Sequence, residues 1–213
     1  MAAEKRTRLD PIARRAQLIT LGVEMLATRT LDELSVEDIA HEAGISRGLL
    51  FHYFSSKQEF HVEVARAAAA ELIARTKPDP SLAPLAALRG ALTAFIDYVE
   101  ENPDNYKSLV RGAASGDAEM RAIFDATRST LAGRIVTVLE VDQALGPRAE
   151  LAVHGWVAFV EECVIRWIAD GGRERDGLTD MLSRALPAVV LAATDQELTP
   201  LTAMLTPATV TAS

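Results

Sequence analysis

The chain has 213 residues, of which 49% are hydrophobic and 5% aromatic, and its formal net charge at pH 7 is −8. This length fits one compact unit or two small ones, and the abundance of alanine and leucine favours helices over strands. Residues 1–61 carry eight Lys/Arg and nine Asp/Glu, whereas residues 62–213 carry fourteen and twenty-one. The chain is therefore not a generally basic nucleic-acid coat, and its acidity resides in the second part.

Cys163 is the only cysteine, which excludes an intrachain disulfide and leaves no thiolate set for a zinc site. We therefore expect a reducing compartment. Residues 1–8 are charged and no long apolar run follows them, a pattern that does not fit a secretory signal peptide. No stretch of about 18 apolar residues is present, so the sequence predicts a soluble, cytoplasmic protein without a membrane span.

The first predicted helix begins at Asp10-Pro11, where an N-cap residue precedes a proline at the first helical position. Apolar residues then recur every three or four positions until the pattern ends at residues 28–30. This spacing predicts a helix with one buried face, made of Ile12, Ala16, Ile19, Val23 and Leu26.

Two short helices are predicted next, with a glycine between them. Ser35 and Asp38 resemble a capping box that opens a helix through Ala43, and Gly44 is expected to end it with a positive φ. Ser46 is the expected cap of the second helix, which runs to about residue 53. The small core around this pair is predicted to consist of Val36, Ile39, Ala40, Ile45 and Leu50.

A fourth helix is predicted to open at residues 55–57 and to end near Lys77, before a linker marked by Pro78, Pro80 and Pro84. Five more helices are expected at about 82–101, 103–114, 118–142, 147–170 and 174–194, the last kinked at Pro187. The sequence thus predicts an all-α chain made of a head, residues 10–72, a body, residues 80–194, and a disordered tail, residues 195–213.

The pair of short helices, residues 35–54, has the pattern of a helix-turn-helix motif. Arg47 on its second helix would read a guanine or hold a phosphate, and Gly48 would let the backbone approach DNA closely. Lys57, at the start of the next helix, would clamp a phosphate. The second helix therefore fits a recognition helix for the DNA major groove, with an outward set made of Ser46, Arg47, Gly48, Leu49, His52 and Tyr53.

The run GISRGLLFHYFSSKQEF, residues 44–60, closely resembles the signature of the TetR (tetracycline-repressor-like) family, and the resemblance covers residues 11–62. It implies nine or ten helices, with a three-helix helix-turn-helix DNA-binding head and a helical-bundle body for ligand binding and dimerisation. It also implies repression of transcription by a homodimer on operator DNA, relieved by a small ligand. By residue match, the implied DNA contacts are Val36, Ser46, Arg47, Gly48, Leu49, Phe51, His52, Tyr53 and Lys57.

Two positions depart from the usual pattern of the family. Phe51 stands where family members usually have tyrosine, so it offers no hydroxyl to a phosphate. Leu49 replaces a more usual polar residue and cannot hydrogen-bond a base, but it can pack on a thymine methyl group.

The helix predicted at 147–170 is apolar on two sides, so it must be covered on two sides. One side would pack within the chain and the other against a second copy, together with the last helix, in a symmetric four-helix interface. The alternative is a helix buried entirely within one chain. The residues predicted at the dimer interface are Leu151, Ala158, Ile165, Leu178, Leu182 and Val189.

Several side chains of the body are candidates for the lining of a ligand pocket, although core packing explains them equally well: Phe95, Tyr98, Tyr106, Arg111, Phe124, His154 and Phe159. His154 and Glu161 lie seven residues apart on one side of their helix, either as a polar pair in a cavity or as an interface or surface contact. Because the body is acidic, a strongly anionic ligand would need basic groups nearby. We expect a small, hydrophobic or amphipathic effector.

Three alternatives to a repressor belong to other classes. An enzyme is disfavoured, because the four histidines lack metal-ligand spacing, Cys163 has no nearby histidine on its helix, and no glycine-rich phosphate loop is present. We therefore expect no catalytic residue, metal site or cofactor. A helical interaction module that no longer reads DNA is disfavoured by the outward set on the second helix. An activator with the same DNA-binding head remains open.

Overall fold

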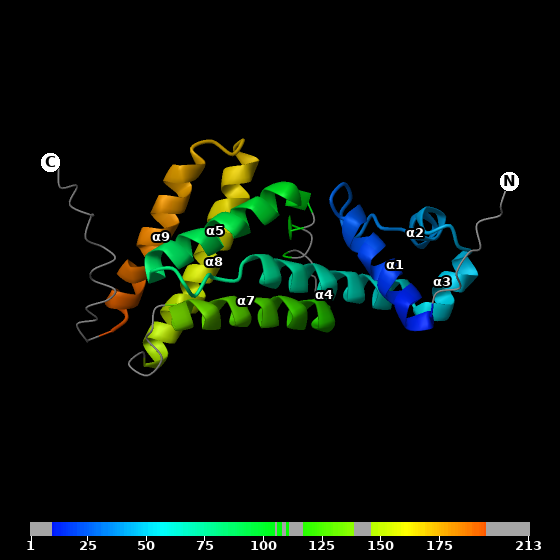
Figure 1. Ribbon diagram of the computed structural model, residues 1–213, viewed down its shortest axis with the longest axis horizontal. Coiled ribbons are helices and arrows are strands. Elements are labelled where there is room, and N and C mark those ends of the chain that lie inside the picture. Colours follow the sequence, from blue (N-terminus) through cyan, green and yellow to red (C-terminus); the bar gives the residue numbers. More distant parts are fainter. Residues whose placement is uncertain (1–9, 105, 108–109, 111–116, 139–145, 195–213) are drawn as a thin grey trace. The chain divides into compact units, whose positions relative to one another are not determined.

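Every regular element in the described part of the computed structural model is a helix (Figure 1). The structure describes residues 10–104, 106–107, 110, 117–138 and 146–194. The all-α fold class is therefore confirmed. Eight helices are bounded within these residues, against the nine or ten that the resemblance implies. Most of the helix expected at 103–114, and all of the tail at 195–213, lie outside the described residues.

The contacts divide the chain into two compact units. Unit 1 comprises residues 1–69 and 104–123, and unit 2 comprises residues 70–103 and 124–213. The division falls inside two helices, α4 (Lys57–Arg75) and α7 (Ala118–Val138). No residue pattern predicts that residues 104–123 group with the first unit, and the domain bounds expected from the sequence remain proposals.

Local capping determines where the helices of unit 1 begin, which are α1 (Pro11–Met25), α2 (Val36–Glu42), α3 (Arg47–Tyr53) and the first part of α4. The Oγ of Ser35 accepts a hydrogen bond from the backbone N–H of Asp38 at 3.0 Å, and Ser46 does the same for Leu49 at 3.2 Å. Gly44, between α2 and α3, has a φ of 63°, a conformation that favours glycine. These three positions act as the sequence predicts.

Helix α4 begins with a reciprocal cap. The backbone N–H of Glu59 donates to Oγ of Ser56 at 3.0 Å, and the Glu59 carboxylate accepts from the backbone N–H of Ser55 at 2.7 Å. The hydroxyl of Ser55 donates to the same carboxylate, and these bonds lower the pKa of Glu59. The start of α4 is therefore set by two consecutive serines and one acid.

The core of unit 1 contains a close approach between α1 and α4. A Cβ placed at Gly22 would lie 2.5 Å from Cγ2 of Val64 and 2.9 Å from Cζ of Phe60. The buried face expected for α1 is therefore only partly right, because the helix turns Leu18 and Gly22 toward the core. Leu26 is buried as expected, whereas Ala16 is exposed and Ile12 is 80% exposed.

Arg15 and His61 are among the polar side chains that connect α4 to the rest of unit 1. Arg15 on α1 pairs with Glu59 and Glu63, each at 3.3 Å, and its guanidinium lies 4.8 Å from the centre of the Phe54 ring. His61 is buried, and its Nε2 donates to the carbonyl oxygen of Leu34 at 3.0 Å. Burial lowers the pKa of His61, so the folded unit favours the neutral ring.

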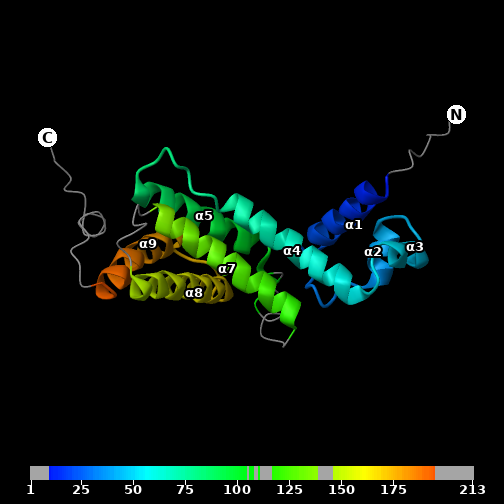
Figure 2. The same cartoon turned by 90° about the horizontal axis from the view of Figure 1, so that it is seen from below.

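Three helices form the centre of unit 2: α5 (Pro84–Glu101), α8 (Pro147–Ala169) and α9 (Arg175–Ala192). Each of them packs against the other two, and they lie together in both views (Figures 1 and 2). Helix α9 continues through Pro187, which is buried. The indole N–H of Trp156 on α8 donates to the carbonyl oxygen of Leu182 on α9 at 3.0 Å.

Ion pairs connect α5 and α9 at two places. Nη1 of Arg89 lies 2.9 Å from Oδ1 of Asp180, and this hydrogen bond lowers the pKa of Asp180. Arg175 pairs with Asp97 and, at 3.3 Å, with Glu100. These contacts fix the register of two helices whose buried faces are apolar.

Candidate nucleic-acid interface and body cavity

Helix α3 presents almost its whole length to solvent. Of its seven residues, only Leu50 is buried, and it is fully covered. The exposed set includes Arg47, Gly48 and His52, and Tyr53 is half-buried. Because Ser46 caps the first turn, the start of α3 is fixed without any contact from the exposed side chains.

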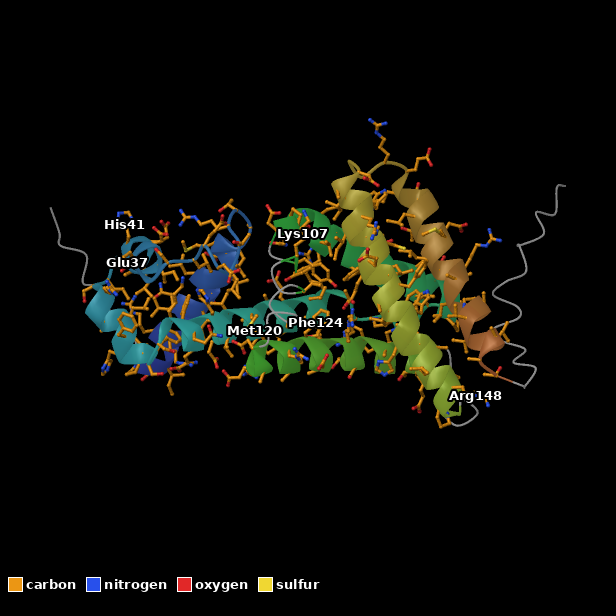
Figure 3. All side chains as sticks on the ribbon, turned by 180° about the vertical axis from the view of Figure 1, so that it is seen from behind. Glu37, His41, Lys107, Met120, Phe124 and Arg148 are labelled. Atoms are coloured by element: carbon orange, nitrogen blue, oxygen red, sulfur yellow. The ribbon has the colours of Figure 1, made fainter. Side chains whose placement is uncertain are left out.

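Arg47 contacts two side chains near the start of α3. Its Nη1 lies 2.7 Å from Oε1 of Glu37 on α2, and its guanidinium lies 5.6 Å from the centre of the Phe51 ring. Glu37 stands beside His41 on the outer surface of α2 (Figure 3). Because Arg47 and Glu37 are each more than half exposed, the pair contributes little to folding, and a DNA base or phosphate can replace the carboxylate.

Two large apolar side chains are also exposed on α3. Leu49 is 39% exposed and Phe51 is 38% exposed. Because removal of apolar surface from water is favourable, a partner that covers these two side chains would gain binding free energy. His52 and Tyr53 form an edge-to-face pair with ring centres 5.4 Å apart. Apolar groups on a surface that faces the major groove can pack on thymine methyl groups, as we expected for Leu49.

Gly48 and Lys57 occupy open positions. A Cβ placed at Gly48 would meet only Oγ of Ser46, at 4.0 Å, so the fold itself does not require glycine there. Lys57 is exposed at the first position of α4, where its Nζ donates to the carbonyl oxygen of Asp32 at 3.4 Å. Both positions are accessible to a phosphate backbone.

Val36 differs from the other residues of the expected DNA contact set. It is buried at the first position of α2, within the core that the sequence also predicts for it. The DNA contact implied at this position therefore lacks an exposed side chain. Sequence reasoning missed Glu37, because its contact with Arg47 arises from the packing of α2 against α3.

Unit 2 contains a cavity of about 60 Å³ under the end of α4. Three helices, α5, α7 and α8, contribute to its wall, together with Thr76 and Pro78 of the segment after α4. Its lining residues are Thr76, Pro78, Leu88, Ala91, Leu92, Phe95, Leu131, Arg134, Ile135, Trp156, Val157, Val160 and Glu161. Ligand pockets usually have volumes of about 300–1,000 Å³, so this cavity has room for only a small part of a ligand.

The polar groups of the cavity wall are bonded within the chain. Glu161 is buried and pairs with Arg128, whose Nε donates to Oε2 of Glu161 at 2.7 Å. Arg134 donates to the carbonyl oxygen of Ile73, in the last turn of α4. Oγ1 of Thr76 donates to the carbonyl oxygen of Leu72 at 2.7 Å. The cavity itself therefore offers mainly apolar surface.

Family models match both parts of the chain. Residues 18–64 match the model for bacterial regulatory proteins of the tetR family, and residues 84–189 match a tetracyclin repressor-like C-terminal domain. The first match contains α2, α3 and the start of α4, and the second spans the cavity-forming helices α5, α7 and α8.

The chain belongs to the TetR family of transcriptional regulators.

Relatives of this TetR-family chain include both an activator and a repressor of transcription. It is 24% identical over 168 residues to the transcriptional activator FasR of Mycolicibacterium smegmatis, a match that covers 76% of this chain and 75% of the relative. It is 37% identical over 93 residues to the transcriptional repressor KstR2 of the same species, covering 43% and 45%. The relatives are regulators, and the expectation that the chain is not an enzyme agrees with the family.

A solved structure of a tetR-family transcriptional regulator from Streptomyces coelicolor has the same fold. It superposes with a TM-score of 0.80 at 28% sequence identity, covering 92% of this chain and 88% of that one. No helix in the described part of the TetR-family chain is long and apolar enough to cross a membrane.

The residues expected to line one ligand pocket lie at different places in the structure. Phe95 lines the cavity, and Tyr98 is buried nearby on α5, where burial raises its pKa to about 12. Phe124 is buried with the Arg128 guanidinium 4.3 Å from its ring centre, and Figure 3 shows it on α7. Tyr106 is buried in unit 1.

Two further expected pocket residues, His154 and Phe159, do not line the cavity. His154 and Phe159 are exposed on α8, and Arg111 lies outside the described residues. Although His154 and Glu161 share one side of the helix, only Glu161 is buried, and it pairs with Arg128 of α7. Sequence reasoning missed Trp156 and Arg134, whose roles depend on how the helices pack.

The residues expected at the dimer interface also fall into two groups. Leu151 is 72% exposed, Val189 is exposed, and Ala158 and Ile165 are half-buried. Leu178 and Leu182 are buried within the chain, where α9 packs on α5 and α8. The four residues of the first group are therefore at least partly accessible to solvent on α8 and α9. Leu178 and Leu182 belong to the core of unit 2.

Proposed function

We propose that the chain is a ligand-responsive repressor that binds a palindromic operator as a homodimer, with α3 as its recognition helix. The observation that carries this proposal is the exposure of α3. Its Ser46 cap and its buried Leu50 hold the helix, and the side chains of Arg47, Leu49 and Phe51 are exposed to solvent. Two such helices in a symmetric dimer would contact successive major grooves roughly 34–36 Å apart.

Arg47 and Lys57 have different roles in this proposal. Arg47 would read a guanine with its planar guanidinium, after Glu37 is displaced by the base. Lys57, next to the N-terminus of α4, would contact a phosphate and carry no sequence information. Leu49 and Phe51 would pack on thymine methyl groups or on the sugar.

Ligand response would be transmitted through α4. Its first part packs on α1 through Phe60 and Val64, and its last turn is bonded to Arg134 beside the cavity. A ligand that displaces the wall of the cavity would tilt α4 and change the spacing of the two recognition helices. A coupling of about 1–3 kcal/mol between ligand and operator is typical of such a mechanism.

The homodimer is supported by apolar side chains that one chain leaves exposed on α8 and α9: Leu151, Phe159, Met181 and Val189. A stable interface needs roughly 1,000 Å² or more of buried surface, so the proposal requires most of both helix faces. Sedimentation velocity of the wild-type chain and of a Leu151→Glu and Phe159→Glu double variant measures the association. A wild-type monomer at micromolar concentration would refute the homodimer.

Repression is proposed over activation because the repressor KstR2 has the higher identity, over the part of the chain it covers. A reporter gene behind the bound promoter, with and without the chain, decides between the two. Lower expression in the presence of the chain supports repression, and higher expression shows activation.

DNA binding is tested by fluorescence anisotropy of the purified chain with the DNA upstream of its own gene, with random DNA as the control and salt varied. If the upstream DNA holds no site, DNA selected from a random pool replaces it. We expect tight, salt-sensitive binding that prefers one sequence, with one dimer per site. Equal and weak binding to selected and random DNA would favour a helical interaction module.

A further inference from the structure

Two spaces meet at the end of α4 and share part of their walls. The first is the apolar cavity of about 60 Å³ already described. The second is a cleft of about 360 Å³ beneath the proline-rich segment, lined by Lys77, Pro78, Asp79, Pro80, Leu82, Pro84, Ala87, Arg134 and Thr137. Pro78 and Arg134 line both spaces, so these two side chains separate the cavity from the cleft.

The charged side chains in the lining of the cleft are two cations, Lys77 and Arg134, and one carboxylate, Asp79. Lys77 makes no ion pair with any residue that the structure describes, and Arg134 donates one hydrogen bond to a backbone carbonyl. The only acid of the lining, Asp79, instead accepts from the hydroxyl and the backbone N–H of Ser81, at 2.6 and 2.9 Å, and these bonds lower its pKa. Asp79 stays charged but pairs with neither cation, so the lining has one cation more than it has carboxylates.

The cavity differs from the cleft in the chemistry that it accepts. Its buried acid is paired with Arg128, and the N–H of Trp156 and the hydroxyl of Thr76 are used by backbone carbonyls. A polar ligand group placed there would have to break one of these bonds, which is unfavourable in apolar surroundings. An apolar group meets Leu92, Phe95 and their neighbours at no such cost.

We propose that unit 2 binds an amphipathic anion, with its apolar end in the cavity and its anionic group in the cleft against Arg134 and Lys77. This inference rests on the proposed function, in which unit 2 holds the effector site, and it names the chemical class of that effector. A carboxylate and a phosphate both match these cations, since each offers acceptor oxygens to a guanidinium and an ammonium group.

Arg134, which would bind the anionic group of the ligand, also holds the end of α4. Arg134 donates to the carbonyl oxygen of Ile73, one of the last carbonyls of α4. An anion in the cleft competes with this carbonyl for the guanidinium, because a charged acceptor binds it more strongly than a neutral one. Ligand binding then releases the last turn of α4, the helix that begins at Lys57 beside the recognition helix.

The experiment measures ligand binding directly, without DNA, so that its failure is separate from a failure of the proposed function. The probes share one chain length and differ in the head group: octanoate, octyl phosphate, octanol and octyltrimethylammonium. Trp156 lines the cavity and the chain has two tryptophans, so a Trp167→Phe background makes Trp156 the only reporter. Its fluorescence is recorded as each probe is added, below the concentration at which the probes form micelles.

We expect octanoate or octyl phosphate to bind at least about tenfold more tightly than octanol, and the cationic probe not to bind. The two anionic arms decide whether the cleft prefers a carboxylate or a phosphate.

Three variants in the same background locate the anion. Lys77→Gln and Arg134→Gln should weaken the anionic probes about tenfold each and leave octanol unchanged. Arg184→Gln removes an exposed cation of α9 that lines neither space, and it should leave all probes unchanged. Since Lys77 is exposed, its variant keeps the test valid even if Arg134→Gln is less stable.

Three results would each overturn the proposal: octanol binding as tightly as the anions, anion binding that is indifferent to both Lys77→Gln and Arg134→Gln, or the absence of any probe signal.

Discussion

Helices α3 and α8 differ in how many of their side chains are buried. Helix α3 has seven residues and buries only Leu50, whereas α8 has 23 residues and buries a mainly apolar face that includes Glu161. The start of α3 is fixed by the Ser46 cap, and α8 is held by its contacts with α5 and α9. The first helix is free to present chemistry to a partner, and the second builds the wall of a cavity.

This difference indicates which substitutions should affect DNA binding and which should affect folding. On α3, substitutions of exposed side chains should change DNA binding at little cost in folding, because those side chains contact few neighbours. On α8, most substitutions on the buried face change packing and the cavity together.

The largest effect on stability is expected at Leu50, the only buried residue of α3. Leu50→Ala should lower the free energy of unfolding by about 3 kcal/mol, because it leaves a cavity between the helices. Leu49→Ala, at the neighbouring exposed position, should cost about 0.5 kcal/mol or less and lower operator affinity instead. Urea unfolding followed by circular dichroism measures both, and equal losses of stability would break the contrast between the two positions.

A somewhat smaller effect is expected at the contact between α1 and α4. Gly22→Ala should destabilise unit 1 by about 1–3 kcal/mol, since its Cβ would overlap with Val64 and Phe60, which are fully buried. Gly90→Ala in α5 is the matched control, because a Cβ there meets nothing within 4 Å. It should stabilise the chain by about 0.5–1 kcal/mol, and thermal unfolding of both variants checks the opposite signs.

A smaller effect, on DNA and not on folding, is expected at Lys57. Lys57→Ala should weaken operator and random DNA alike by about 1 kcal/mol or less and reduce the slope of log affinity against log salt by about 1. Anisotropy titrations at several salt concentrations measure the slope. A loss confined to the operator would make Lys57 a residue that reads sequence.

The smallest effect concerns pH. Burial lowers the pKa of His61, so below pH 6.5 the unfolded chain binds a proton that the folded chain does not. Stability should therefore fall as the pH falls from 6.5 to the pKa of the folded state. His61→Gln should flatten this dependence, whereas His41→Gln, at an exposed position of α2, should keep it. An unchanged slope in His61→Gln would remove His61 as the cause.

The features that the sequence could predict are those set by neighbours along the chain. The caps at Ser35 and Ser46 and the turn at Gly44 need only a few adjacent residues, and the structure contains all three. The burial of Gly22 could not be predicted in the same way, because it depends on where α4 crosses α1. The amphipathic pattern of α1 therefore placed Ile12 in the core, although it is exposed.

The same limit explains the candidate sites. The exposed face of α3 follows from a short motif, so most of its residues could be named in advance. The cavity is built from residues of three helices and of the segment after α4, and of the expected residues that the structure describes, Phe95 alone lines it. Arg134 and Lys77 have no distinguishing sequence pattern, and their roles depend on the cleft formed when α7 packs beside the end of α4.

The central claim is that α3 reads DNA sequence, and its most direct test compares two arginines of unit 1. Arg47 lies on α3, and Arg66 is an exposed arginine of α4 that pairs with Glu63. The affinity of Arg47→Ala and Arg66→Ala for the operator and for random DNA is measured by anisotropy. We predict that Arg47→Ala loses about 1–3 kcal/mol on the operator and less on random DNA, whereas Arg66→Ala binds both as the wild type does. Wild-type operator affinity in Arg47→Ala would contradict the assignment of α3 as the recognition helix.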